Sequence, residues 1–337
     1  MQGKGELRET ALDIVTTLRE PLPLTLAFVA HHLEQGVRCL HLYFDDAENP
    51  AIGILSTIRQ IRVTVCDPHY WAGQGGRPGM IVARQTANAQ DAQRHARSPW
   101  LLHCDSDEFL IQTRYILRVL GAVDDDLSVL RLPVWERCFG PEGPDPGLFG
   151  GLCRGPVLAP ATVYGNLASE LTRGMAAYAG CKSITRVGAG LAIGIHDSAP
   201  PDGTPVGQAP VRRRMLHLPQ IVHFDGLTPA HAAAKMIDRG HDIPASRRPA
   251  IMSPARSAQI TALMAGMVEQ GSYFRRLRGL TAAAHRALVA QDAVMAMPVN
   301  PAAAAARRWP QAAVLFKPEP FDRVMHDQLV GRWRQSA

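Results

Sequence analysis

The sequence lacks the features that mark membrane-spanning, disulfide-rich and zinc-finger proteins. No run approaches about 20 uninterrupted apolar residues, the length that a membrane-spanning helix needs. Residues 1–13 contain no apolar core of a signal peptide. The six cysteines are scattered without a CxxC pair, which argues against a disulfide framework or a zinc site and for a reducing compartment. We therefore expect a cytoplasmic, soluble protein, whose basic surface also allows peripheral association with the inner membrane.

Lysine is scarce as well. There are only four, at positions 4, 182, 235 and 317, among 36 lysines and arginines. The net charge of +6 and the isoelectric point of about 9.2 favour anionic partners such as nucleotides and phosphates. No stretch interleaves basic and aromatic residues, so we expect no nucleic acid partner. The absence of G-x-G-x-x-G and G-x-x-x-x-G-K-[ST] argues against a dinucleotide-binding Rossmann domain and a P-loop NTPase.

The first hundred residues alternate short apolar segments with segments of helical spacing. We predict strands over residues 10–18, 37–44, 61–66 and 100–104, and helices over 24–35, 54–60 and 80–97. Gly36 follows the first helix as a C-cap signal. This alternation predicts an α/β fold in which helices flank a mostly parallel sheet.

The later part of the chain is less regular. We predict strands over residues 128–134 and 216–224, helices over 228–240, 257–269, 280–295 and 318–333, and a linker-like stretch over 297–310. The helix at 228–240 has Thr228 as its N-cap and Pro229 in its first position. We divide the chain into an α/β domain over residues 8–245 and a helical C-terminal extension over 246–337.

Three carboxylates follow the apolar strand over residues 100–104. Asp105, Asp107 and Glu108 lie where open α/β sheets bind ligands, beyond the carboxyl end of a strand. Carboxylates this close repel one another, and a divalent cation such as Mg²⁺ or Mn²⁺ would relieve the repulsion. Asp105 and Asp107 are therefore candidate ligands of one metal ion. The alternative is a solvated acidic turn that caps a helix over residues 111–119, because D-x-D is common by chance.

Aspartates also end the second and third predicted strands, at Asp45 and Asp67. The carboxyl ends of parallel strands meet at one edge of a sheet, so these two acids and Asp105 would line one crevice. A nucleotide could bind there through hydrogen bonds from its base and ribose to Asp45 and Asp67, with its phosphates on the metal ion.

Several short motifs occur in a fixed order over residues 10–240. They are the segments 30–37 and 43–46, Arg84-Gln85 with Asn88, W-L-x-x-x-D-x-D-E-F at 100–109, W-x-x-x-F-G at 135–140, K-x-I-x-R at 182–186, G-I-H at 194–196, H-F at 223–224 and K-x-x-x-R-G at 235–240. Together they resemble bacterial glycosyltransferases of the GT-A fold, in the family 2-like group that is related to glycosyltransferase family 92. The first strand is followed by Arg19-Glu20 where that family has R-N-E, and Asp45-Asp46 continues with Ala47 where the family has Ser and Asp.

The resemblance implies a metal-dependent glycosyltransferase of the hexosyltransferase type, with a GT-A-like sheet that binds a nucleotide-diphosphate sugar. It implies transfer with inversion from a UDP- or GDP-sugar to a glycan or lipid-linked acceptor, in polysaccharide biosynthesis. Asp105, Asp107 and His223 would hold the Mn²⁺ or Mg²⁺ ion. The implied contacts to nucleotide and phosphates are Asp45, Asp67, Asp105, Lys182, Arg186 and Lys235, with Arg239 as a further phosphate ligand.

An inverting transfer also needs a general base for the acceptor hydroxyl. Glu136, at the end of a predicted strand, is the first candidate, and Asp145 and His196 are alternatives; Glu136 and Asp107 are thus the predicted catalytic residues. Two other functions stay open: a metal-dependent nucleotidyl- or phosphotransferase that uses the same acids, and a non-catalytic nucleotide-binding protein derived from a transferase. Independently of these functions, the alternative for His223 is an ordinary core histidine on an apolar strand.

Overall fold

The computed structural model describes residues 10–144, 147–204 and 211–336, with side chains up to residue 329. These residues form two compact units. Unit 1 combines the described residues of 10–106, 110–133 and 180–221, and unit 2 those of 107–109, 134–179 and 222–336. The chain therefore passes between the units several times, and one boundary separates Ser106 from Asp107. The domain boundary that we expect at residue 245 stays a prediction.

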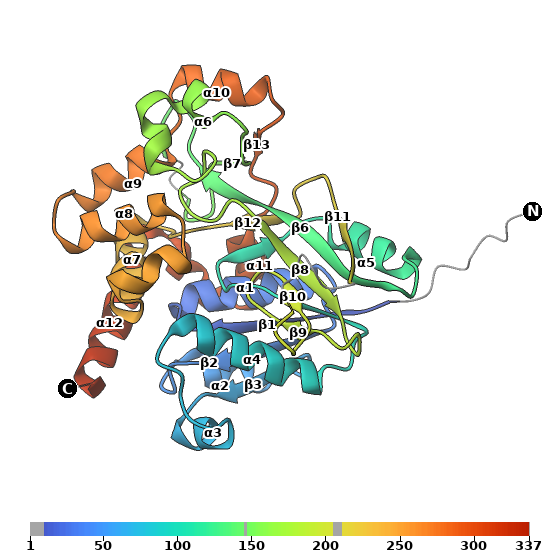
Figure 1. Cartoon of the computed structure of the whole chain (residues 1–337). Helices are drawn as coiled ribbons and strands as arrows, with labels where there is room; N and C mark the ends of the chain where they lie inside the picture. The colour runs from blue at the N-terminus through green and yellow to red at the C-terminus, as the bar shows by residue number, and fades with distance from the viewer. Residues whose placement is uncertain (1–9, 145–146, 205–210, 337) are drawn as a thin grey trace, which may run out of the picture. The chain divides into compact units, whose positions relative to one another are not determined.

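Unit 1 is built on a mixed sheet. Its strands are β1 (Leu12–Leu18), β2 (Cys39–Phe44), β3 (Ile61–Val65), β4 (Trp100–His103), β8 (Cys181–Arg186), β11 (Arg212–Met215) and the first part of β6 (Leu127–Cys138). A separate two-stranded sheet pairs β9 (Ala192–Ile193) with β10 (Ser198–Ala199). The strand order is β6-β8-β4-β1-β2-β3 (Figure 1). The strands β1 to β4 run parallel, whereas β8 is antiparallel to both β4 and β6. This mostly parallel arrangement confirms the predicted α/β class.

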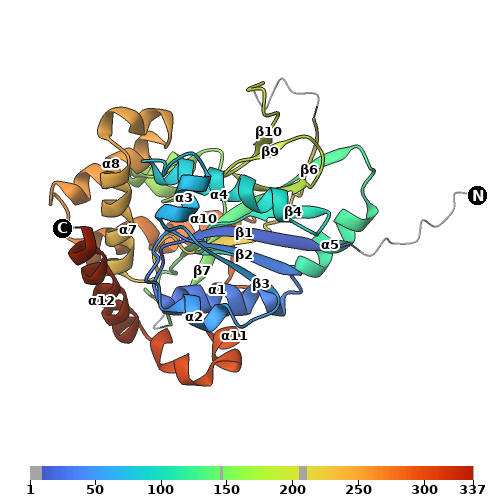
Figure 2. The same cartoon turned by 90° about the horizontal axis from the view of Figure 1, so that it is seen from below.

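Helices cover both faces of this sheet. They are α1 (Leu22–Glu34), α2 (Ala51–Leu55), α3 (Pro68–Gly73), α4 (Ile81–His95) and α5 (Thr113–Ala122). Figure 2 shows α1 and α2 on one side of β1 to β3 and α4 on the other. Ala89 and Ala92 of α4 pack against Val15 and Leu101 in a buried apolar cluster. All seven residues of β1 are buried, as a central strand covered on both faces requires.

Two local features of unit 1 differ in how well the sequence indicates them. The first helix ends as predicted, because Gly36 has a φ of +87°, in the left-handed region that favours glycine. Helix α3, by contrast, lies between the predicted strand over 61–66 and the predicted helix over 80–97, where we predicted no helix. Its formation follows from Asp67, whose side chain accepts a hydrogen bond from the backbone N–H of Tyr70, and from Pro68 in the first turn.

Unit 2 combines a small antiparallel sheet with many helices. The last part of β6 pairs with β7 (Leu152–Arg154), which pairs with β13 (Val294–Ala296). The helices are α6 (Pro160–Tyr164), α7 (Pro229–Asp242), α8 (Pro254–Met264), α9 (Gln270–Arg278), α10 (Ala282–Val289), α11 (Pro301–Arg308) and α12 (Pro318–Ser336), with 3-10 helices η1 (Gly165–Glu170), η2 (Ala245–Ala250) and η3 (Pro310–Phe316). Helix α7 packs against α8 and α9 through a cluster that includes Met236, Ile260 and Phe274 (Figure 1).

The structure corrects three predictions in the later part of the chain. The linker-like stretch over residues 297–310 is wrong, because it contains α11, whose first turn is capped by Asn300. The predicted helix over 280–295 ends early, and β13 follows it. The predicted strand over 216–224 shrinks to β12 (Ile221–His223), and a short strand β5 (Glu108–Leu110) precedes α5. The predicted N-cap of α7 is confirmed, since Thr228 accepts a hydrogen bond from the backbone N–H of His231.

No helix in the described part of the chain is long and apolar enough to cross a membrane.

Candidate functional site

The first acid of the D-x-D motif belongs to a charged cluster in unit 1, the Asp105 cluster. Asp105 follows the carboxyl end of β4, and antiparallel pairing of β4 with β8 brings Lys182 beside it. The Lys182 Nζ lies 2.9 Å from one carboxylate oxygen of Asp105, and Gln85 of α4 donates to the other at 2.9 Å. The side chain of Lys182 is fully buried. Its burial and this pairing mean that Asp105 is the carboxylate that compensates the charge of Lys182.

Electrostatics keep the Asp105 cluster in one protonation state. Although burial alone would raise it, Lys182 and His103 hold the pKa of Asp105 well below its usual range. Burial, with a further contribution from Lys182, lowers the pKa of His103 to about 4. The ring of His103 contacts the backbone O of Gly194 through Nδ1 at 2.9 Å, and its buried Nε2 has no hydrogen-bond partner among the described residues. The cluster at neutral pH is therefore an ionised acid, a charged lysine and a neutral imidazole.

Asp45 and Asp67, the predicted base and ribose ligands, lie at the ends of β2 and β3 as expected. The buried carboxylate of Asp45 is held by Arg77, at 3.0 Å, and by Arg84, at 3.2 Å. Asp67 caps α3 with a hydrogen bond of 2.8 Å from Tyr70. Each acid therefore has a structural role in this arrangement, and their contacts to a nucleotide stay predictions.

The structure separates two residues that we grouped together as phosphate ligands. Lys182 lies at the end of β8 next to Asp105, but Arg186 lies four residues further along the strand and pairs with Trp100 at the opposite end of β4. The guanidinium of Arg186 stacks over the ring of Trp100, 4.4 Å from its centroid. It also donates to the backbone oxygens of Leu127 and Asp124, at 2.8 and 2.9 Å. The structure therefore does not bring Arg186 to the Asp105 cluster.

The second acid of the motif belongs to a cluster in unit 2, the Asp107 cluster. One oxygen of Asp107, Oδ2, lies 2.5 Å from Nζ of Lys235 on α7 and 3.2 Å from Nε2 of His223 at the end of β12. The backbone N–H of Phe224 donates to the backbone O of Asp107 at 2.8 Å, which fixes the strand end beside the acid. Both Asp107 and His223 are buried. The structure thus brings three predicted site residues together in this unit.

The charge of Asp107 decides the protonation of His223. Burial alone would lower the pKa of His223, but the carboxylate of Asp107 raises this pKa to about 9. The imidazole is therefore a cation at neutral pH when no metal ion competes with the proton. Its other ring nitrogen, Nδ1, is buried and has no hydrogen-bond partner among the described residues.

Asp225 is a neighbour that the sequence analysis missed. Both its oxygens accept hydrogen bonds from Arg256, at 2.8 and 2.9 Å, and one also accepts from Arg278 at 2.8 Å. Although burial would raise it, these two arginines hold the pKa of Asp225 well below its usual range. The missed residues carry no motif in the sequence, since Arg256 and Arg278 come from a region that we predicted only as helical.

The Asp107 cluster fits a divalent cation in part. One donor atom each from Asp107, His223 and Asp225 lie within 4.8 Å of one another. A carboxylate and an imidazole suit Mn²⁺ better than Mg²⁺, which prefers oxygen ligands. Asp225 fits less well, because arginines already take both of its oxygens. Asp107 and His223 are therefore the two better candidate ligands of this group. A cation would compete with Lys235 for the same oxygen of Asp107.

Glu136, the first candidate for the general base, lies in a different environment from the one we expected. Its carboxylate is buried, accepts two hydrogen bonds from Arg154, at 3.0 and 2.6 Å, and accepts the backbone N–H groups of Ala176 and Ala177. A base must reach the acceptor hydroxyl, and an acid saturated with internal donors does not. We therefore assign Glu136 a structural role in unit 2. Of its alternatives, Asp145 lies outside the described residues, and His196 is close enough to Asp105 to lower the pKa of that acid.

The chain resembles known proteins in structure rather than in sequence. No family model matches it, and no curated protein matches it. A structure of residues 1–349 of TarS from S. aureus has 12% identity and a TM-score of 0.35, over 76% of this chain and 70% of that one. The mannosyltransferase PcManGT from Pyrobaculum calidifontis, in complex with GDP-Man and Mn²⁺, has 13% identity and a TM-score of 0.37, over 96% and 86%. A nucleotidyl transferase from Methanothermobacter has 16% identity and a TM-score of 0.26, over 37% and 65%.

Proposed function

We propose that this chain is a metal-dependent glycosyltransferase that uses a nucleotide-diphosphate sugar. The observation that carries the proposal is that both acids of the D-x-D motif are paired with lysines, Asp105 with Lys182 and Asp107 with Lys235. The chain has only four lysines, so half of them contact two acids that are separated by one residue in the sequence. Pairs of this kind suit a metal diphosphate, because carboxylates bind the cation and ammonium groups bind phosphate oxygens.

In the proposed function, Lys182 of unit 1 and Lys235 of unit 2 each exchange a carboxylate partner for a phosphate oxygen. Asp107 and His223 hold the cation, and the expected role of Asp105 as a metal ligand stays a prediction. The cation would stabilise the negative charge that develops on the leaving diphosphate. His196 replaces Glu136 as the proposed base for the acceptor hydroxyl. Hexosyl transfer with inversion to a glycan or lipid-linked acceptor, a relation to family 92 and a cytoplasmic location at the inner membrane belong to the same proposal and rest on the resemblance of the motifs.

One observation favours a second function, metal-independent nucleotide binding without turnover. The carboxylates of Asp105 and Asp107 are already neutralised by lysines, and Lys235 occupies the oxygen that a cation would take. In such a protein, Asp107 would position Lys235 for a phosphate, and a cation would add nothing. The two functions therefore differ in whether nucleotide binding needs a divalent ion.

Thermal unfolding with UDP, GDP, CDP and ADP, each with and without Mn²⁺, separates the two. A ligand at about 100 times its Kd stabilises the folded state by about 2.7 kcal/mol. The transferase proposal expects stabilisation by one diphosphate that requires Mn²⁺ and is lost in Asp107→Asn. Asp126→Asn, the same change in an exposed ion pair, is the matched control and should keep the stabilisation. An equal shift without Mn²⁺ would favour the binding protein, and no shift with any nucleotide would count against both.

Product analysis separates the transferase from a nucleotidyltransferase. A glycosyltransferase that is incubated with its nucleotide-diphosphate sugar and Mn²⁺ slowly releases the nucleoside diphosphate, because the bond between the sugar and the diphosphate breaks. A nucleotidyltransferase breaks the bond between the two phosphates, so from the same donor and water it releases the nucleoside monophosphate and the sugar phosphate instead. Appearance of these two as the main products would replace the proposed reaction with phosphoryl chemistry at the same acids.

A further inference from the structure

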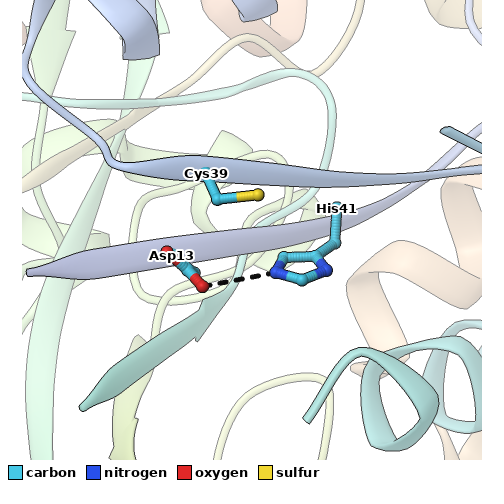
Figure 3. Close-up of side chains that lie close together, drawn as sticks. All are labelled: Asp13, Cys39 and His41. Atoms are coloured by element: carbon cyan, nitrogen blue, oxygen red, sulfur yellow. Dashed lines mark hydrogen bonds and ion pairs between the residues drawn. The ribbon is translucent and has the colours of Figure 1, made fainter. Parts of the chain in front are cut away.

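A second cluster of metal-binding side chains lies in unit 1, at the amino ends of two parallel strands. It comprises Asp13, near the start of β1, and Cys39 and His41 of β2 (Figure 3). Asp13 lies directly opposite Cys39 in the sheet, and His41 is two residues further along, so all three side chains project from one face. Asp105 follows the other, carboxyl end of neighbouring β4. The cluster is therefore distinct from the Asp105 cluster.

We propose that Asp13, Cys39 and His41 form a transition-metal site that is best matched to Zn²⁺. The donor set is a carboxylate, a thiolate and an imidazole. Zn²⁺ binds all three kinds of ligand, whereas Mg²⁺ and Ca²⁺ take oxygen ligands. Three protein ligands leave a fourth tetrahedral position for water or another small ligand. The lack of CxxC pairs argued against a zinc site in the sequence. That argument does not apply to this cluster, because two adjacent strands supply its ligands.

The spacing of the donor atoms fits a tetrahedral ion. One donor atom from each residue lies within 4.8 Å of the other two. The Nε2 of His41 and the Oδ2 of Asp13 are 3.3 Å apart. Zn²⁺ bonds of about 2.0–2.3 Å in tetrahedral geometry place neighbouring donors about 3.3–3.6 Å apart. The imidazole and the carboxylate already have this separation.

A hydrogen bond to the other oxygen of Asp13 supports the same assignment, while the backbone N–H groups of Arg97 and Ser98 approach Oδ2 at 3.4 Å. The hydroxyl of Ser98 donates to Oδ1 at 2.5 Å, and this contact fixes the carboxylate with Oδ2 directed toward His41. Such outer contacts commonly orient metal ligands. Asp13 and His41 are buried, while Cys39 is only half-buried, so the thiol lies on the side from which an ion would enter.

The plain alternative is a buried Asp13–His41 pair with an uninvolved cysteine, and cobalt distinguishes the two. Co²⁺ replaces Zn²⁺ in tetrahedral sites, and a cobalt–thiolate bond gives a charge-transfer absorption that oxygen and nitrogen ligands do not give. The experiment adds Co²⁺ to the full, reduced chain after removal of metals by chelation, and follows this absorption. We expect about one equivalent to bind with the thiolate band, and Zn²⁺ to remove the band.

Three variants make the result specific. Cys39→Ser should abolish the thiolate band while keeping the far-ultraviolet circular dichroism of the folded chain. Cys181→Ser, at the other half-buried cysteine, is the matched control and should keep the band. Asp107→Asn should also keep it, which separates this site from the proposed nucleotide site. Absence of a thiolate band in the folded wild-type chain, or an unchanged band in Cys39→Ser, would overturn the proposal.

Discussion

The two acids of the D-x-D motif have histidine neighbours in different protonation states. His103, in the Asp105 cluster of unit 1, has its pKa lowered to about 4 and is neutral at pH 7. His223, in the Asp107 cluster of unit 2, has its pKa raised to about 9 and is cationic. Both rings are buried, with exposed fractions of 2% and 8%, and burial lowers the pKa of both. Burial therefore does not distinguish them.

The nearest charge makes the difference. Lys182 adds to the effect of burial at His103, because a second positive charge disfavours the imidazolium. At His223 the carboxylate of Asp107 outweighs burial. Histidine in two buried acid–lysine clusters is thus neutral in one cluster and protonated in the other. The pH dependence of stability that each histidine contributes has the opposite direction.

The largest test of this comparison concerns the arginines around the Asp107 cluster. Asp225→Asn should lower the free energy of unfolding by about 3–5 kcal/mol, because it leaves Arg256 and Arg278 buried without a carboxylate. Urea denaturation measures the loss. The control, Asp126→Asn, removes the exposed partner of Arg212 and should cost less than about 1 kcal/mol. Similar losses in both variants would mean that the buried ion pairs do not support unit 2.

The next test removes the charge that protonates His223. A histidine whose folded pKa is raised stabilises the fold below its unfolded pKa of about 6.5 and loses that contribution as pH rises through about 9. The difference of 2.5 units corresponds to about 3 kcal/mol. In Asp107→Asn, with chelator present, this loss between pH 6.5 and 9 should disappear, and the pKa of His223 measured by NMR should fall below its ordinary value.

A double variant checks the assignment of that effect. In a His223→Gln background, Asp107→Asn should no longer change the slope of stability against pH between 6.5 and 9. If the slope still changes, a group other than His223 carries the alkaline pH dependence.

The sequence indicated the sheet of unit 1 well, for a physical reason. Its central strands β1 and β4 are fully buried, and the parallel strands are separated by helices with clear signals, such as Gly36 after α1. The failure at α11 has an equally local cause. Prolines at 298, 301 and 310 are typical of a linker, but alanine is the best helix former and Asn300 is a good N-cap for the run of alanines between them.

The sequence indicated the acids of the two candidate clusters but not the residues that contact them. The acids follow an apolar strand, which is a local signal, but their partners are 77 and 128 residues away, at Lys182 and Lys235. The role of both lysines as phosphate ligands was inferred from the resemblance of the motifs, because the sequence does not show which acids they contact. His103 was counted as part of an apolar strand, because only the fold shows that a lysine lies near it. The sequence also did not reveal the environment of Glu136, since its partner Arg154 comes from the next strand.

A third test sharpens the comparison from the side of unit 1. Below pH 6.5 the unfolded chain protonates His103, but the folded chain does not until about pH 4, so stability should fall as the pH drops. This contribution is about 2 kcal/mol between pH 6.5 and 5. His103→Gln should flatten that part of the curve, measured by urea denaturation. His69→Gln, which removes an exposed imidazole from the same unit, is the control, and an equal flattening there would refute the assignment to His103.

The smallest expected effect isolates the charge of Lys182 from burial. Lys182→Met keeps most of the side-chain volume but removes the ammonium group, so the pKa of His103 should rise from about 4 by about one unit, equivalent to about 1.4 kcal/mol. Burial should keep it below 6.5, because the ring stays enclosed. NMR titration of the ring measures the shift, and Lys317→Met, at another lysine of the chain, is the control. A pKa that stays at about 4 in Lys182→Met would mean that burial alone sets it, and that the nearest charge distinguishes the two histidines only at His223.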